Sequence, residues 1–150
     1  MAETLAARIA QPDLVGLPEW RVAEILNAPD PAFPLVRRSV NKRDAQEILL
    51  ASGEWAQVYM VAENTAAPAE LRGACINLRD TIRLTETIAM DNPAIYAAVD
   101  AVLSGLVAAQ FLTAQTRAAL LALADRPQSW AEYNQSEVTP REVSLIRGGK

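Results

Sequence analysis

Hydrophobic residues recur at helical spacing along most of the chain, and proline, glycine and capping residues separate these segments. The segment from about 68 to 89 shows the clearest pattern. Its predicted buried face follows i, i+4, i+7, i+11 spacing and consists of Leu71, Cys75, Leu78 and Ile82. The segment 93–109 carries Asp100 as its one charge. A helix this apolar is typical of the centre of a core or of a contact between subunits.

Capping residues and prolines predict where the other helices begin. Asn41 and Thr113 are typical N-caps, which predict helices over 42–51 and from 113 to about 124. The remaining predicted helices cover 2–10, 18–27, 55–62 and two short segments that open on capping boxes, Ser129–Glu132 and Thr139–Glu142. The sequence therefore predicts an all-α fold, a compact bundle of about eight or nine helices, several of them short.

A proline-rich connector over 28–40 interrupts this helical pattern. Pro29, Pro31 and Pro34 fix φ and remove backbone donors, which predicts extended chain. Residues 35–40 are open to two interpretations, one short strand or more extended chain. An extended proline segment that includes Phe33 loses little entropy on binding, so a docking arm is one hypothesis. The favoured interpretation is a rigid linker that lies over its own domain.

The length of 150 residues predicts one domain. Within it, 1–27 would hold the short N-terminal helices, 28–40 the connector and 41–150 the main helical body. Apolar residues make up 51% of the chain and charged residues 21%, so the composition is that of an ordinary globular protein.

The side chains needed for common catalytic and metal sites are scarce. The chain has no histidine, which removes the usual general base and the commonest metal ligand. Cys75 lies on the predicted apolar face and is expected to be a buried, inert thiol. Glu86 and Asp91 could form an acid pair, but Asp91 is better explained as part of a helix cap. We therefore predict no enzyme activity, no catalytic residue, no metal ligand and no cofactor.

Two clusters of basic residues are candidates for phosphate contacts. The first contains Arg37, Arg38, Lys42 and Arg43, and the second contains Arg72, Arg79 and Arg83 at helical spacing. The formal net charge is −4, and nearby acids can neutralise both clusters. A solvated or protein-paired face is the favoured interpretation, and a nucleic-acid-contacting accessory protein is the alternative.

Surfaces for protein partners are the remaining candidates for function. The apolar helix 93–109 would contribute Ile95, Val99, Val102 and Leu106, either to the core or to an oligomer interface. Trp20, Trp55 and Trp130 are possible interface anchors, although core packing is favoured for each. Self-association or binding to other proteins is the expected mode of action.

No segment indicates secretion or membrane insertion. The N-terminus carries an acid where a signal peptide would be basic, and the apolar stretch that follows is interrupted at Gln11-Pro12-Asp13. The longest uncharged run, 101–116, is too short and too polar to span a membrane.

Three features of the sequence form a recognisable pattern. The chain opens with a short helix, Leu26-Asn27 and the proline-rich connector, and it closes with the stretches from Leu120 to Glu132 and from Glu137 to Val143. A Leu-Thr-x-x-x-Arg-x-x-Leu-Leu-x-Leu pattern is matched by Leu112, Thr113, Arg117, Leu120, Leu121 and Leu123. Over most of its length the chain thus resembles small helical proteins encoded among tailed-bacteriophage morphogenesis genes. The resemblance implies a virion component of the tail, neck or baseplate, located in the virion or in the host cytoplasm during assembly. It implies no catalytic residues.

Overall fold

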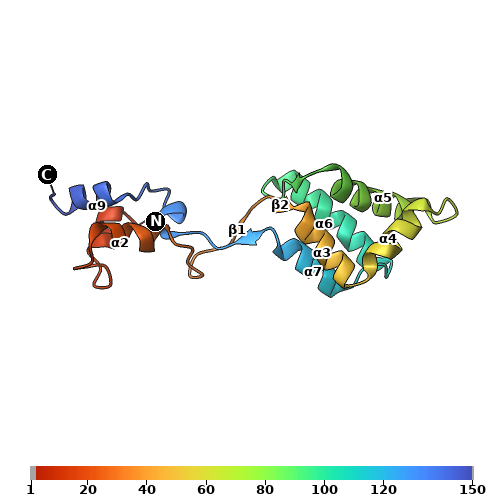
Figure 1. Ribbon diagram of the computed structural model, residues 1–150, viewed down its shortest axis with the longest axis horizontal. Coiled ribbons are helices and arrows are strands. Elements are labelled where there is room, and N and C mark those ends of the chain that lie inside the picture. Colours follow the sequence, from red (N-terminus) through yellow and green to blue (C-terminus); the bar gives the residue numbers. More distant parts are fainter. Residues whose placement is uncertain (1–2, 150) are drawn as a thin grey trace. The chain divides into compact units, whose positions relative to one another are not determined.

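The computed structural model describes residues 3–149, and this part of the chain is mainly helical, as the sequence predicts. Its nine helices are α1 (Leu5–Ile9), α2 (Glu19–Asn27), α3 (Lys42–Ala51), α4 (Glu54–Glu63), α5 (Ala69–Leu84), α6 (Pro93–Ala108), α7 (Ala114–Ala122), α8 (Trp130–Tyr133) and α9 (Pro140–Ile146) (Figure 1). The same residues also form four short strands, β1 (Val36–Arg37), β2 (Val40–Asn41), β3 (Thr87–Ile88) and β4 (Asp125–Arg126). These strands are a small β component that the predicted all-α fold does not include.

The chain divides into two compact units, where the sequence predicts a single domain. Unit 1 combines the two ends of the chain, with described residues 3–35 and 127–149, and unit 2 is the continuous segment 36–126. The first boundary falls inside the predicted connector. The second follows β4 and carries no local signal, because it depends on pairing between segments about 90 residues apart.

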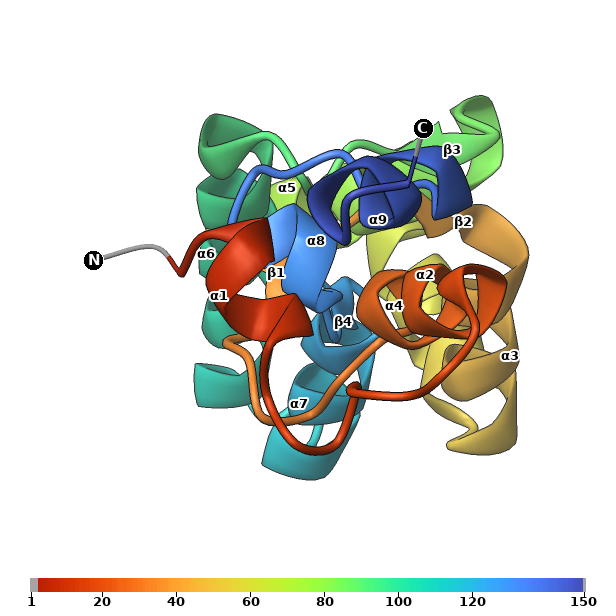
Figure 2. The ribbon, with the colours of Figure 1, turned by 90° about the vertical axis from the view of Figure 1, so that its left-hand side faces the viewer.

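Unit 1 packs four short helices from the two chain ends around one small core. Helix α2 contacts both α8 and α9, and α1 lies beside α8 (Figure 2). The indole nitrogen of Trp130 donates a 2.9 Å hydrogen bond to the Glu3 carboxylate. The buried core residues are Ile9, Leu14, Val22, Ala23, Leu26, Trp130, Ala131, Val138 and Val143.

Both predicted capping boxes are present in unit 1. The Ser129 hydroxyl accepts from the backbone amide of Glu132, and the Glu132 carboxylate accepts from that of Ser129. Thr139 and Glu142 make the same reciprocal pair at the start of α9. These pairs satisfy donors that the first helical turn leaves unpaired, so the two helices begin where the sequence places them.

The three tryptophans occupy different environments. Trp130 is buried in unit 1, and Trp55 is half-buried against the core of unit 2. The prediction of core packing is wrong for Trp20, which is 61% exposed. The buried face of α2 is centred between Val22 and Leu26, and Trp20 lies about 140° around the helix from that centre.

Unit 2 is a closed bundle of five helices, α3 to α7, which can be followed in Figure 1. Each helix from α3 to α7 packs against the next in the chain, and α7 packs back against α3. The predicted buried face of α5 is confirmed, with Leu71 packed at its edge. The buried core residues are Ala45, Leu49, Val58, Ala62, Cys75, Leu78, Ile82, Leu103, Leu106, Leu112 and Leu120.

Two helices end earlier than the sequence predicts, because the residues that follow them form short antiparallel ribbons. Strand β2 pairs with β3, with Val40 opposite Ile88, and β1 pairs with β4, with Val36 opposite Arg126. The predicted helix 68–89 is wrong beyond Leu84, because residues 87–88 leave the helix to pair with β2. The predicted helix to about 124 ends at Ala122 for the same reason, since the chain continues into β4. Residues 35–40 accordingly contain β1 and enter β2.

A buried carboxylate links the starts of two helices in unit 2. Gly53 adopts a left-handed conformation (φ 74°) that separates α3 from α4, and Glu54 is the first residue of α4. The Glu54 Oε1 atom accepts a 2.7 Å hydrogen bond from the backbone amide of Thr113, the N-cap of α7. Its other oxygen, Oε2, is buried and has no hydrogen bond of good geometry to the described residues.

The balance of forces at Glu54 favours its charged form. Burial raises the pKa of the Glu54 carboxyl, but the nearby hydroxyls of Thr116 and Ser52 and the hydrogen bond from the Thr113 amide lower it. These polar neighbours together outweigh burial, so the pKa lies below its usual value. The carboxylate therefore stabilises the α4–α7 junction.

Candidate interaction surface on unit 2

Helix α6 begins at a strong cap and carries no unpaired charge along its length. The Asn92 side chain accepts a 3.0 Å hydrogen bond from the Ala94 amide, and Pro93 occupies the first helical position. Asp100, its single charged residue, accepts a 3.0 Å hydrogen bond from Nε of Arg117 on α7. The rest of the helix surface is uncharged.

The inner side of α6 completes the core of unit 2. Leu103 and Leu106 are buried, and Val99, Val102 and Val107 pack against the core as half-buried residues. Leu106 is fully buried, so this candidate contact residue of the sequence analysis belongs to the core and not to an interface.

The outer side of α6 is an exposed stripe of small residues, which we call the small-residue stripe. It consists of Ala94, Ala97, Ala98, Ala101, Ser104, Gly105 and Ala108. These positions lie at offsets of 0, ±3, ±4 and ±7 from Ala101. The spacing of the stripe is therefore the same in both directions along the helix. The sequence does not distinguish the exposed from the buried alanines of an apolar helix, so the stripe was not predicted; its spacing of three and four residues was the available signal.

A cavity of about 300 Å³ opens between α5 and α6. The candidate residues Ile95, Val99 and Val102 line it and do not belong to the stripe. Ile95 is 37% exposed at the surface. The structure thus places Ile95, Val99 and Val102 in the cavity lining and Leu106 in the core. Ile95 is also exposed, but the small-residue stripe consists of residues that were not candidates.

The proline-rich connector is tied to its own unit. Phe33 stacks on the ring of Tyr133, with ring centroids 5.0 Å apart, and packs against the core of unit 1. The Gln128 side chain donates a 2.9 Å hydrogen bond to the Pro34 carbonyl. Pro29 pairs with Ser129, while the rings of Pro29, Pro31 and Pro34 belong to exposed residues. These contacts favour the rigid-linker interpretation over a free docking arm.

The first basic cluster makes contacts within unit 2. The Arg37 guanidinium lies 3.3 Å from the centroid of the Tyr96 ring. Arg38 donates to the Leu123 carbonyl at 3.1 Å, and Lys42 forms a 2.7 Å ion pair with Glu86. Arg43 is exposed.

The second basic cluster is similarly occupied. Arg72 donates from Nε to the Ala62 carbonyl at 3.1 Å. Arg79 pairs with Glu63 and, at 2.8 Å, with Asp80, while Arg83 is exposed. Because these contacts use most of the candidate arginines, the protein-paired interpretation is better supported than a phosphate-binding face.

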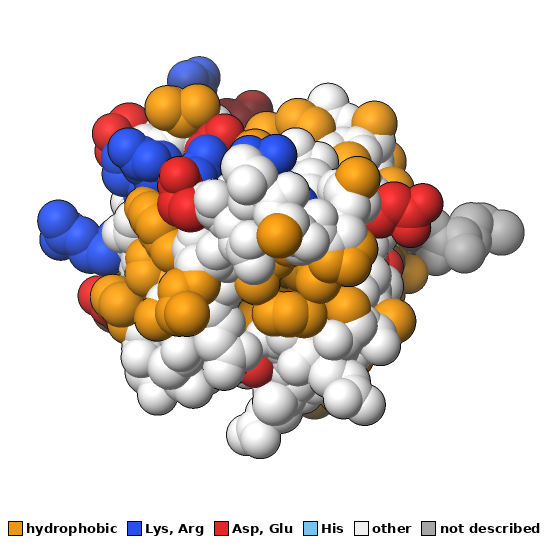
Figure 3. All heavy atoms as spheres, turned by 90° about the vertical axis from the view of Figure 1, so that its right-hand side faces the viewer, with side chains coloured by type: hydrophobic (Ala, Val, Ile, Leu, Met, Phe, Trp, Pro, Cys, Tyr) orange, Lys and Arg blue, Asp and Glu red, His pale blue; other side chains and the backbone are white. Residues whose placement is uncertain are grey.

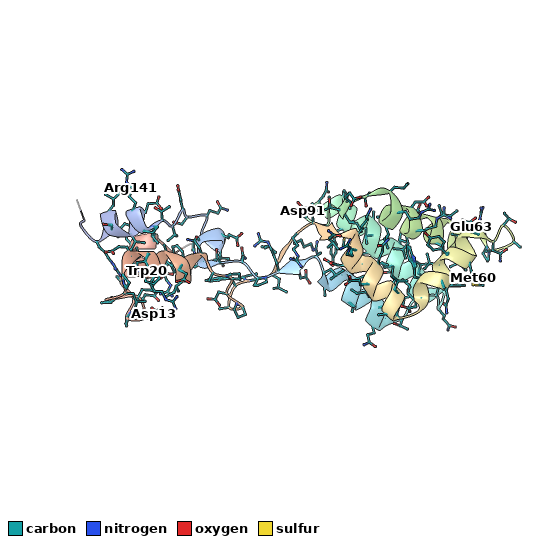
Figure 4. All side chains as sticks on the ribbon, in the orientation of Figure 1. Asp13, Trp20, Met60, Glu63, Asp91 and Arg141 are labelled. Atoms are coloured by element: carbon teal, nitrogen blue, oxygen red, sulfur yellow. The ribbon has the colours of Figure 1, made fainter. Side chains whose placement is uncertain are left out.

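A second group of exposed apolar side chains lies on the end of unit 2 that includes α4 (Figure 3). Met60 is 73% exposed there, and it points outward from α4 near Glu63 (Figure 4). The ion pair between Glu63 and Arg79 borders this group, whereas no unpaired charge interrupts the stripe on α6. We therefore regard α6 as the better candidate for a contact between proteins.

The chemistry that the structure offers elsewhere is limited. Cys75 is fully buried, and burial raises the pKa of its thiol, which favours the unreactive protonated form. Residues 3–149 contain no cluster of three His, Cys, Asp or Glu side chains placed to hold a metal ion. None of the helices in this range combines the length and apolarity that crossing a membrane requires.

Comparison of the chain with known protein families, with curated proteins and with solved structures found no match.

Proposed function

We propose that this chain is a non-enzymatic structural protein that acts through protein–protein contacts, and that it associates with a second copy of itself through α6. The resemblance to phage morphogenesis proteins supports a role in a tailed-phage particle, such as its tail, neck or baseplate. The small-residue stripe is the observation that carries the proposal, because seven exposed small residues leave the uncharged outer face of a 16-residue helix uncovered.

The symmetry of the stripe favours a second copy over an unrelated partner. Two-fold symmetry brings the same surface of both molecules together. If two α6 helices pack antiparallel with the axis at Ala101, then Ala94 faces Ala108, Ala97 faces Gly105 and Ala98 faces Ser104. Small side chains allow two helices to approach to roughly 8 Å between axes. The internal pairing of Asp100 with Arg117 reduces repulsion between like charges across the contact.

The size of the stripe indicates that this association is weak. A helix of 16 residues is about 24 Å long and about 10 Å wide, so its footprint is on the order of 240 Å². A stable interface of standard size buries about 800 Å² on each partner. Flanking residues would enlarge the contact, but we expect an equilibrium between monomer and dimer.

Light scattering after size-exclusion chromatography, over a range of protein concentrations, tests this proposal. We expect the mass of the wild type to rise with concentration from the 16.3 kDa of the monomer toward twice that value. Ala101→Glu would place two carboxylates beside each other at the symmetry axis, so association should weaken about tenfold or more, equal to about 1.4 kcal/mol.

Ala56→Glu is the matched control, because Ala56 is exposed on α4 and lies outside the stripe. Its mass should follow that of the wild type. A strictly monomeric wild type at high concentration, or equal weakening by both substitutions, would contradict self-association through α6.

A further inference from the structure

The cavity between α5 and α6 reaches into the core of unit 2. Its walls come from α3, α5, α6, α7 and the β2–β3 ribbon. Several of its lining residues are also buried core residues, which places its floor well below the surface. These deep residues are Val40, Ala45, Leu78, Ile82, Met90 and Leu103.

The lining of the cavity is apolar, with one polar edge. Asn77 and Thr81 are its two polar residues, and they lie one helical turn apart on α5. No charged residue contributes to the lining. A ligand suited to these walls would be mainly hydrocarbon and uncharged, with room for one hydrogen-bonding group near the α5 edge.

Water and a protein helix both fit this cavity poorly. A volume of about 300 Å³ corresponds to roughly ten water molecules, each of which needs two to four polar partners, and two polar side chains supply too few. One turn of an α-helix with its side chains occupies on the order of 400 Å³, so a partner helix would not enter.

We propose that this cavity binds a small, uncharged, predominantly hydrocarbon molecule. The class includes medium-chain alcohols and compounds of similar size and polarity. This site goes beyond the self-association described above, although Ala98 belongs both to the stripe and to the cavity lining. Ligand binding and solution mass are measured separately, so either proposal can fail without the other.

A series of straight-chain alcohols from 1-hexanol to 1-dodecanol is the probe for this site, with isothermal titration calorimetry on the full chain. Each added methylene should lower the dissociation constant about 3- to 4-fold while the alcohol still fits, because burying one methylene contributes about 0.8 kcal/mol. The gain should stop once the chain outgrows the cavity. 1-Octanol should bind more tightly than octanoate, because the lining offers no cation to the carboxylate.

Val99→Phe should fill the cavity and abolish alcohol binding while the helical circular dichroism signal is retained. Val102→Phe is the second filling variant, for the case in which the first does not fold. Val15→Phe introduces the same side chain at an exposed valine of unit 1 and should bind alcohols as the wild type does. Methyl-resolved NMR should place the shifts at Ile82, Ile88 and Val99.

Three outcomes would overturn the proposal. The first is an absence of alcohol binding. The second is an affinity that keeps rising up to 1-dodecanol and does so equally in the filling variants. The third is equal affinity for 1-octanol and octanoate. The second would indicate adsorption on exposed apolar surface.

Discussion

Trp130→Ala is expected to unfold unit 1 and leave unit 2 folded. The substitution removes a buried indole from the core of unit 1, together with its hydrogen bond to Glu3. Replacing a buried tryptophan by alanine costs about 3–5 kcal/mol. A unit of some 60 residues is stable by only about 3–9 kcal/mol. The loss would therefore consume much or all of the stability of unit 1.

Amide hydrogen exchange measures this result residue by residue. Protection should fall over 3–35 and 127–149 and persist over 36–126, because each hydrophobic core is made of residues from its own unit. Trp20→Ala is the matched control, and because Trp20 is exposed its cost should stay within about 0.5 kcal/mol. Simultaneous loss of protection in both units would contradict the division of the chain.

Glu54→Ala is expected to lower the stability of unit 2 by about 2–3 kcal/mol. The change removes a charge-assisted hydrogen bond to the Thr113 amide, and such bonds contribute about 1.5–3 kcal/mol. For a unit of about 90 residues, this loss corresponds to a fall in melting temperature of roughly 10–20 °C. Thermal unfolding followed by circular dichroism measures it. Glu47→Ala, at an exposed position on α3, should change the melting temperature little.

The same carboxylate predicts how stability depends on pH. The pKa of Glu54 is lower in the folded state than in the unfolded state, so its contribution is fully present above the unfolded value, about 4.3. The contribution is lost as the pH falls through the folded pKa. Glu54→Gln removes the titrating group, so its unfolding free energy should fall less steeply than that of the wild type below about pH 4.5. Parallel curves for the two proteins in acid would contradict this role.

Local signals in the sequence located the helix starts from α2 onward to within one residue, whereas α1 begins at Leu5, later than the predicted segment 2–10. Asn41 and Asn92 act as side-chain caps, and α3 spans 42–51 as predicted. These features depend on residues within one or two turns, so one sequence is enough to locate them.

The strands and the second unit required information that local patterns do not carry. Ile88 continues the apolar pattern of the preceding helix, yet it pairs with Val40, 48 residues earlier in the chain. The boundary after Arg126 likewise depends on Val36, its partner in the β1–β4 ribbon. Such pairings follow from tertiary packing and leave no periodic signal in one segment.

The candidate surface was only partly predictable because α6 is apolar around its circumference. An amphipathic helix shows which side is buried, but a uniformly apolar helix gives no direction. Val99 and Val102 therefore appeared equivalent to Leu106, although the former line a cavity and the latter is core. The exposed side consists mainly of alanines such as Ala101, and alanine occurs readily on both buried and exposed helix faces, so it gave no signal.

Disulfide cross-linking through α6 tests the proposed two-fold contact most directly. Under mild oxidation, Ala101→Cys should form a covalent dimer, because two copies of position 101 meet at the axis within the roughly 7 Å between Cα atoms that a disulfide allows. Ala94→Cys alone should remain monomeric, since two copies of position 94 would lie about 21 Å apart along the helices. A mixture of Ala94→Cys and Ala108→Cys should cross-link, and the buried Cys75 should not react. Failure of Ala101→Cys to cross-link, or equal cross-linking by Ala94→Cys alone, would contradict the account.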